Sequence, residues 1–444
     1  MLVQIEPALN ERTRSHSNVH VFETALGWFV LLVDGSRVYS VDEGSALALE
    51  ADSTEKTLNA LGLHDKVGGL DQVPQTMPIR SLSLAVAQKC NLGCTYCYAQ
   101  KGTFGGQPTN MDRSAALQAV RLLFENAKAG DKVNLAFLGG EPLVNRALIH
   151  ECTEFAASIS RTAGVQVNFS ITTNGTLLNE DDGRFFEQHG FAVTISLDGV
   201  GRTHDALRPF QNGKGSYASV IKNARPLLET QLRMQVSARV TVTPKNLRLK
   251  ETLDELLRLG FHSVGFSPML HAPSGQHEMA DDSLAEMLQQ MIECGGEFER
   301  RVLRGERYAF SNAVSAMQEI HKGTHRPYPC GAGAGYLGVS ASGALYACHR
   351  FVQDEKTRFG DVWSGVNIDV QTRWLSQRHV HNQVPCSRCW ARYFCGGGCH
   401  HEVLHRGRPA CDYVRGWLDY CLKAYVRLRV GAPEYFSELC STSA

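Results

Sequence analysis

Three cysteines in one short segment, Cys90, Cys94 and Cys97, have the residue type and spacing of a metal site. Three thiolates can each bind one iron of a [4Fe–4S] cube, which leaves the fourth iron without a protein ligand. Catalytic metal sites keep such an open position, whereas structural sites are closed. Half of a zinc site and three buried thiols are the alternatives. A structural zinc ion needs a fourth ligand, however, and this segment does not supply one.

Small and polar residues follow the strands that the sequence predicts after this segment. They are Gly139-Gly140-Glu141-Pro142, Thr173-Asn174-Gly175-Thr176, Ser196-Leu197-Asp198-Gly199, and then His204 to Arg208. In this order, and with Tyr96 before the last cysteine of CxxxCxxC, they resemble the radical SAM superfamily over roughly residues 80–270. The resemblance implies that one electron from the cluster cleaves S-adenosylmethionine (SAM). The products would be methionine and a 5′-deoxyadenosyl radical that abstracts a substrate hydrogen.

The same resemblance implies which residues contact SAM. They are expected to be Tyr96, Gly139, Gly140, Glu141, Asn174, Ser196, Asp198 and Arg208. Glycines let the backbone approach a ligand closely, and the GGEP backbone is expected to receive the methionyl amino group. Arg208 is expected to pair with the SAM carboxylate through charge-assisted hydrogen bonds, although a lone arginine is also compatible with an ordinary surface residue. No catalytic acid or base is assigned.

A second array holds half of the 14 cysteines, between Cys330 and Cys411. Its spacing resembles the SPASM domain of radical SAM enzymes, which carries two auxiliary [4Fe–4S] clusters. The CxxC pair alone is also compatible with a zinc ribbon. The resemblance assigns Cys330, Cys348 and Cys399 to the first auxiliary cluster, and Cys386, Cys389, Cys395 and Cys411 to the second. Cys421 falls on the apolar stripe of a predicted helix, Asp412–Arg427, and is therefore expected in the core. Cys152, Cys294 and Cys440 stand alone and are predicted to be ordinary thiols.

The elements that position these residues alternate between short apolar runs and amphipathic stretches. Strands are predicted at Ser81–Ala87, Lys132–Leu138, Gln166–Thr172, Ala192–Leu197, Gln235–Val242 and Ser263–Pro268. Helices are predicted at Arg113–Asn126, Arg146–Arg161, Glu180–His189, Tyr217–Glu229, Leu249–Leu259 and Ser283–Arg304, with Pro226 expected to kink or shorten the fourth. Six βα units imply parallel strands with right-handed crossovers, so an α/β fold with an open (β/α)6 barrel is expected. A doubly wound sheet is the alternative.

Three domains are expected: an N-terminal segment at residues 1–75, the partial barrel at 76–310 and the cysteine-rich two-cluster domain at 320–430. The first segment shows β-like stretches at Val19–Glu23, Trp28–Val33 and Arg37–Val41, with a turn at Asp34-Gly35 and a helical stretch near Gly44–Leu63. An exposed strand edge there would suit docking of a leader peptide by strand addition. A domain that only caps the barrel is the alternative.

Composition excludes several function classes. Lys+Arg and Asp+Glu are equal at 45 each, and this neutral balance argues against a nucleic-acid partner. The apolar runs are too short to cross a membrane, and no signal pattern begins the chain, so a cytoplasmic location is expected. In a reducing compartment, so many cysteines favour metal binding over disulfides.

Two reactions compete, because SPASM enzymes mostly act on ribosomally made peptides or small proteins. Anaerobic sulfatase maturases, which form formylglycine, resemble the chain in cluster count. They carry an aspartate where this sequence has His349 and a cysteine where it has Tyr336. Stretches around Cys330 and Cys348 are more similar to thioether-forming peptide maturases, a group that includes the enzyme modifying the small subunit of quinohemoprotein amine dehydrogenase. An intrapeptide thioether is therefore the expected product.

The resemblance also implies an electron donor such as flavodoxin or ferredoxin. A pure iron–sulfur electron carrier is the non-enzyme alternative, but a carrier needs no SAM pocket. Tyr336 raises a further expectation, because a phenol with a pKa of about 10 is a poor iron ligand beside thiolates. One iron of the first auxiliary cluster is therefore expected to stay open to a substrate cysteine. A closed cluster that only conducts electrons is the alternative.

Overall fold

The computed structural model describes residues 18–52, 54–63, 73–74 and 76–441. Its main sheet contains six parallel strands, each hydrogen-bonded to the one before it in the chain. They are β4 (Ser81–Gln88), β6 (Lys132–Gly139), β7 (Gln166–Thr173), β8 (Ala192–Ser196), β9 (Gln235–Val242) and β10 (Val264–Pro268). The strand order of a doubly wound sheet reverses at a switch point. This order never reverses, so the open barrel is confirmed and the doubly wound alternative is wrong.

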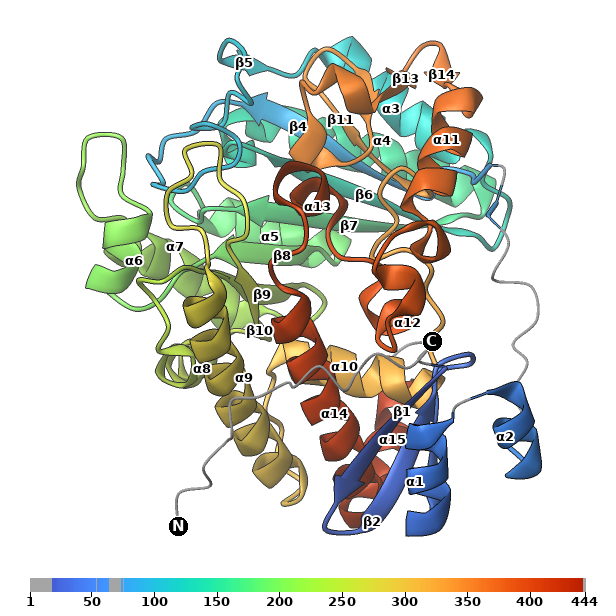
Figure 1. Ribbon diagram of the computed structural model, residues 1–444. Coiled ribbons are helices and arrows are strands. Elements are labelled where there is room, and N and C mark those ends of the chain that lie inside the picture. The colour runs from blue at the N-terminus through green and yellow to red at the C-terminus, as the bar shows by residue number, and fades with distance from the viewer. Residues whose placement is uncertain (1–17, 53, 64–72, 75, 442–444) are drawn as a thin grey trace.

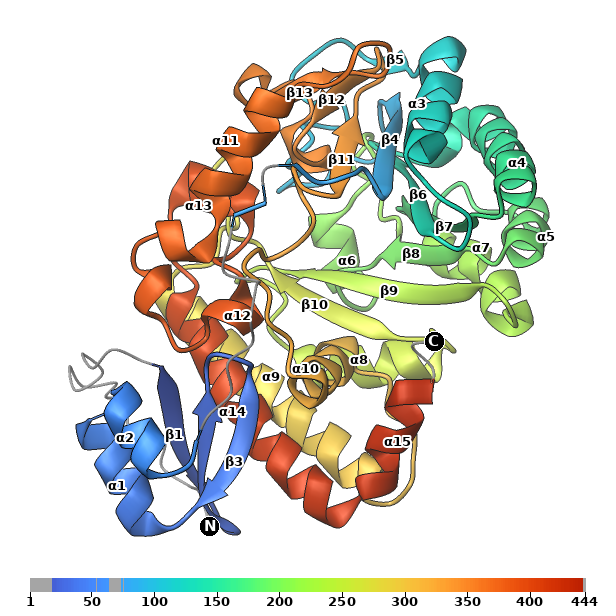
Figure 2. The same ribbon diagram turned by 90° about the vertical axis from the view of Figure 1, so that its right-hand side faces the viewer.

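Helices cover the outer face of this half-barrel (Figures 1 and 2). They are α3 (Arg113–Glu125), α4 (Arg146–Ala163), α5 (Glu180–His189), α7 (Tyr217–Thr230), α8 (Leu249–Arg258) and α9 (Asp281–Val302), with short α6 (Arg202–Leu207) and the 3-10 turn η1 (Pro142–Asn145) between strands. Pro226 does not shorten its helix as expected: α7 continues past Pro226 to Thr230. Val220, Ala224 and Leu227 on that helix are fully buried, and their packing outweighs the local cost of proline.

The two faces of each barrel strand differ in polarity. On β9, Val236, Ala238, Val240 and Val242 are buried beneath the outer helices. The residues between them, Ser237, Arg239 and Thr241, keep accessible surface on the opposite face. Alternation of side chains along a strand therefore lines the inside of the half-barrel with polar groups.

The cysteine-rich region extends the same sheet. Strand β11 (Tyr336–Val339) pairs in parallel with β4, the first barrel strand, and three antiparallel strands follow. These are β12 (Ala344–Tyr346), β13 (Arg358–Asp361) and β14 (Gly365–Val366), while β5 (Thr109–Asn110) pairs with the end of β4. No strand was predicted after residue 320, because segments this short carry too little periodicity to be recognised.

Helices and turns complete this region (Figure 2). They are α10 (Ser311–Lys322), α11 (Ile368–Arg378), α12 (Arg392–Cys395), α13 (His400–Arg406), α14 (Cys411–Gly431) and α15 (Pro433–Ser441), with turns η2 (His349–Phe351), η3 (Glu355–Thr357), η4 (Val380–Asn382) and η5 (Cys386–Arg388). Helix α14 is longer than the predicted Asp412–Arg427. Within the described residues, no helix is long and apolar enough to span a membrane.

The N-terminal part forms a separate antiparallel sheet of β1 (Val19–Thr24), β2 (Gly27–Leu32) and β3 (Arg37–Val41), as the alternating pattern predicted. The single helical stretch expected near Gly44–Leu63 is instead two helices, α1 (Glu43–Ala51) and α2 (Glu55–Ala60). Asp52, whose backbone is extended, interrupts them, and its side chain accepts from the hydroxyls of Thr54 and Thr57.

This sheet packs on the cysteine-rich region. The His20 ring stacks on Trp390 with centroids 3.8 Å apart, and its Nε2 lies 2.9 Å from Asp419 of α14. Asp34 in the β2–β3 turn accepts from Arg392 at 3.2 Å. The N-terminal sheet is therefore fixed beside the cysteine array. Its role in leader docking remains a prediction, and residues 1–17, 53, 64–72 and 75 of the N-terminal segment lie outside the described chain.

Candidate active site

Cys90, Cys94 and Cys97 lie on the loop that follows β4, at the carboxyl end of the parallel strands. Ligands bind at this end in barrels and open α/β sheets. All three are free thiols, and Cys90 and Cys97 act electrostatically on Cys94. Burial raises the pKa of Cys90 to about 11 and that of Cys94 to about 12. Crowded thiols that resist ionisation are suited to a cationic cluster, which would stabilise them as thiolates.

Among the described residues, no three Cys, His, Asp or Glu side chains converge as ligands of one metal ion would. A [4Fe–4S] cube has a different ligand requirement, because each of its irons binds one thiolate and the thiolates need not meet at one point. The donor set of the loop therefore fits a [4Fe–4S] cluster with one iron left for another ligand, as the spacing predicted.

Glycines bring this loop against the end of β6. A Cβ on Gly140 would lie 2.4 Å from the Lys89 carbonyl oxygen and 2.7 Å from Cα of Gly102. A Cβ on Gly139, which has φ +148°, would lie 2.3 Å from the Ala87 oxygen. These distances are too short for any side chain. Glycine is therefore required at both GGEP positions, because the loop of Cys90, Cys94 and Cys97 (the cluster loop) packs closely against them.

Glu141 joins the ends of two barrel strands. Its buried carboxylate accepts from the Leu143 N–H at 3.0 Å, from the Thr173 hydroxyl at 2.7 Å and from the Asn174 N–H at 2.7 Å. Asn174 Nδ2 in turn lies 3.7 Å from the Cys90 sulfur. Glu141 therefore acts as a positioning residue for the loop that carries Asn174, and that loop contacts the cluster cysteine.

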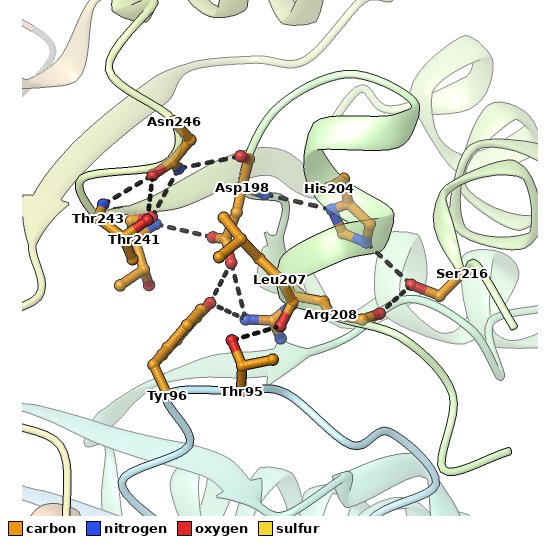
Figure 3. Close-up of polar contacts among 10 residues, drawn as sticks. All are labelled: Thr95, Tyr96, Asp198, His204, Leu207, Arg208, Ser216, Thr241, Thr243 and Asn246. Atoms are coloured by element: carbon orange, nitrogen blue, oxygen red, sulfur yellow. Dashed lines mark hydrogen bonds and ion pairs between the residues drawn. The ribbon is translucent and has the colours of Figure 1, made fainter. Parts of the chain in front are cut away.

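Tyr96, Asp198 and Arg208 form a buried polar triad beside the cluster loop (Figure 3). The Tyr96 hydroxyl donates to Asp198 Oδ2 and accepts from Arg208 Nη1 at 2.7 Å. Arg208 Nη1 lies 3.6 Å from the same carboxylate oxygen. The partners of Arg208 in the described structure are thus protein groups. Its buried Nε has no hydrogen-bond partner among the described residues, so pairing of Arg208 with a SAM carboxylate stays a prediction.

Residues outside the predicted set hold Asp198 in place. Asp198 Oδ1 accepts from the Thr241 N–H at 2.9 Å, and its carbonyl accepts from Asn246 Nδ2 at 3.0 Å. Its N–H donates to His204 Nδ1 at 3.3 Å, and burial lowers the pKa of His204 to about 3, which keeps the ring neutral. Sequence reasoning missed Thr241 and Asn246, although both lie at or just after the end of β9, where site residues were expected. Ser196 is the last residue of β8 and pairs in register with Arg239.

The three cysteines predicted to hold the first auxiliary cluster lie near one another, and their ligand role stays a prediction. Cys330 and Cys399 both act electrostatically on Cys348, although they are far apart in the chain. The Tyr336 hydroxyl is 2.7 Å from His349 Nδ1 and 2.8 Å from the Ser83 hydroxyl. Tyr336 thus belongs to a hydrogen-bonded set that connects β11 with β4.

The second group lines one cavity of about 220 Å³. Its cysteines are Cys386, Cys389, Cys395 and Cys411, with Cys399 at the border of the first group. Cys421 does not line this cavity and is fully buried within α14. The geometry therefore favours Cys411 over Cys421 as the fourth ligand of this group.

Tyr98, which the sequence did not single out, lies between the barrel site and the first auxiliary group. Cys97 and Cys348 both act electrostatically on its hydroxyl, and the Arg350 guanidinium lies 5.3 Å from its ring centroid. Arg350 also lies 3.8 Å from the Cys399 sulfur and 2.7 Å from Glu402. The two cysteine groups are thus neighbours across one aromatic ring.

Known proteins are similar to this chain in sequence and fold. Residues 84–256 match the model of the Radical SAM superfamily. The chain is 25% identical over 375 residues to a serine-type anaerobic sulfatase-maturating enzyme of Klebsiella aerogenes, covering 82% of this chain and 90% of that protein. It is 32% identical over 179 residues to a cysteine-type enzyme of Clostridium novyi, covering 38% of this chain and 45% of that protein.

Solved structures with the same fold include anSMEcpe with bound AdoMet, with a TM-score of 0.65, 18% identity and coverage of 78% of this chain and 98% of that one. A second structure of anSMEcpe, with AdoMet and the Cp18Cys peptide bound, has a TM-score of 0.64 and 19% identity and covers 79% of this chain and 99% of that one. At this identity the likeness concerns the fold, and it confirms the partial barrel.

Proposed function

We propose that this chain, a radical SAM enzyme, forms an intrapeptide thioether in a ribosomally made peptide or small protein. The observation that carries the proposal is the arrangement of cysteines: an open three-thiol loop at the barrel mouth faces a second cysteine group across Tyr98. A peptide substrate is supported by the relatives, whose names describe sulfatase maturation, and by the relative solved with a peptide bound.

The residues of the site have different positioning roles. SAM bound at a [4Fe–4S] cluster supplies a 5′-deoxyadenosyl radical. Cys90, Cys94 and Cys97 would hold that cluster, while Glu141 keeps the loop of Asn174 beside it. The triad of Tyr96, Asp198 and Arg208 connects the loop of the three cysteines with the end of β8 (Figure 3). Tyr96 and Asp198 are buried, so water competes little with the hydrogen bonds of the triad.

Thioether formation removes one hydrogen from carbon and one from sulfur and forms one S–C bond. SAM accounts for the first hydrogen, which leaves as 5′-deoxyadenosine. The second leaves as a proton, and one electron returns to an acceptor, for which the auxiliary clusters are suited.

Incubation of the reduced enzyme with SAM and a synthetic cysteine-containing peptide tests this proposal. We expect 5′-deoxyadenosine together with a peptide that has lost two hydrogens and resists alkylation by iodoacetamide. Its Cys→Ala version serves as the control and should stay unmodified. A product that keeps its free thiol would contradict the proposal.

Formylglycine is the second candidate product, because the serine-type maturase of Klebsiella aerogenes matches 82% of the chain. The same incubation separates the two reactions. An aldehyde product reacts with a hydrazide, whereas a thioether does not. A hydrazide adduct would therefore assign the chain to sulfatase maturation.

The first auxiliary cluster is proposed to leave one iron open to the substrate thiol. Within the described chain, Tyr336 is engaged with Ser83 and His349, and Cys421 is buried in α14. We expect a cysteine-containing peptide to change the electron paramagnetic resonance spectrum of this cluster, and its Cys→Ser version to leave it unchanged. Cys421→Ala should retain the effect. Equal spectra with both peptides would indicate a closed cluster.

A flavodoxin or ferredoxin as electron donor and docking of a leader peptide on the N-terminal sheet belong to the same proposal. The second is supported by the packing of His20 on Trp390 and Asp419, which holds that sheet beside the cysteine array.

A further inference from the structure

Arg239 carries a positive charge inside the half-barrel, among neutral polar groups. It lies on the inner face of β9 between Ser237 and Thr241, and its backbone pairs in register with Ser196 of β8. Residues on the other face of the strand are buried under helices, whereas Arg239 keeps accessible surface. The half-barrel is open, so a charged side chain on this face is directed to an interior that a ligand can enter.

The guanidinium extends from β9 across the neighbouring strand β10. Its Nη2 donates to the Ser267 hydroxyl. A Cβ on Gly265 would lie 3.0 Å from Nη1 and 2.5 Å from the Ser311 hydroxyl, so glycine at this position makes room for the charged group. Arg239 therefore points toward β10 and the C-terminal helices. The cluster loop and Glu141 lie in the other direction along the sheet, at the ends of β4 and β6.

No acidic residue of the described chain balances this charge. Arg239 takes part in none of the ion pairs, and the titratable side chain that acts on it is Tyr413, a phenol that is neutral near pH 7. Surrounding groups lower the pKa of the guanidinium by partial desolvation, yet the side chain keeps solvent-accessible surface. Ser267 uses one of five N–H donors, and none of the others is sealed from solvent. The guanidinium is thus accessible, has no acidic partner among the described residues and keeps unused donors that an anion can engage.

We propose that Arg239 binds a carboxylate of the peptide substrate, either an acidic side chain or the C-terminus, inside the half-barrel. A guanidinium matches a carboxylate through two parallel hydrogen bonds, and the remaining donors of Arg239 are available for such a contact. The proposal rests on the peptide substrate of the proposed function. SAM also has a carboxylate, but the guanidinium extends away from the strands that hold the cluster loop.

Binding of two synthetic peptides to the intact, cluster-loaded enzyme tests this contact. The peptides carry one Cys and are identical except that one has Glu where the other has Gln. We expect the Glu peptide to bind more tightly than the Gln peptide. Arg239→Gln should remove that preference by lowering the affinity for the Glu peptide about ten- to hundred-fold. Arg239→Lys should keep part of it. Arg248→Gln, at a side chain that is 85% exposed, should keep all of it.

Two readouts separate this contact from SAM binding and from folding. SAM affinity and uncoupled 5′-deoxyadenosine formation should be unchanged in Arg239→Gln. If SAM affinity or 5′-deoxyadenosine formation fell while peptide affinity stayed the same, Arg239 would be assigned to SAM binding. Phenylglyoxal should label Arg239 in the unmodified protein, and the Glu peptide should protect it. Protection by SAM alone, or equal protection by both peptides, would overturn the proposal. Absence of SAM cleavage in the wild type would instead overturn the proposed function.

Discussion

Replacing Cys90, Cys94 and Cys97 together with Ala is expected to abolish SAM cleavage while the C-terminal cysteine groups keep their iron. Iron should fall by about four atoms per chain, which is one cube. The reason is geometric, because the three thiols share one loop after β4, whereas the other groups lie on η5, α12, α14 and the loops that flank β11, β12 and α13. Iron analysis and chromatographic detection of 5′-deoxyadenosine measure both effects.

Cys152 provides the matched control for this triple variant. It is a fully buried thiol on α4 with no cysteine partner, so Cys152→Ala should change neither iron content nor SAM cleavage. Continued formation of 5′-deoxyadenosine by the triple variant would refute the assignment of the loop. Loss of all iron would show instead that the C-terminal cysteine groups depend on the loop for folding.

Asp198→Asn is expected to destabilise the protein by about 3–5 kcal/mol, because it leaves the buried charge of Arg208 without its partner. Asp198 is fully buried and Arg208 is 12% exposed, so water compensates little. The loss should appear as a lower melting temperature of the anaerobic holoenzyme, together with weaker SAM binding. Arg208→Ala should also weaken SAM binding while the cluster is retained.

The double variant Asp198→Leu/Arg208→Met distinguishes stability from function. Replacement of a buried ion pair by apolar groups is often close to neutral, so the melting temperature should recover while SAM affinity stays low. Asp182→Asn is the matched control, because Asp182 is fully buried and pairs with Arg146 at 2.6 Å outside the triad. It should lower stability by a smaller amount, since Arg146 is 33% exposed, and leave SAM affinity intact. An unchanged melting temperature in Asp198→Asn would contradict the triad.

Local patterns determined much of the barrel. Strand β9 and helix α5 have the predicted limits, because alternating and helical periodicity report directly which face is buried. The cluster loop was recognisable for a similar reason, since its three cysteines are close in the chain and their spacing alone constrains their geometry. The strands β11 to β14 were missed because each is too short to show a period.

Contacts between distant segments were decided only by the tertiary structure. Arg208 lies near Asp198 in sequence, yet Tyr96 completes the triad from another strand end. In the sequence, nothing distinguishes Tyr98 from other aromatic residues; only the fold brings Cys348 near it. Arg239 looks like one polar residue of an alternating strand, and only the curvature of the half-barrel places its charge on the inner face. Sequence patterns reflect the burial of each residue along its own element, whereas partners and uncompensated charges depend on which elements meet.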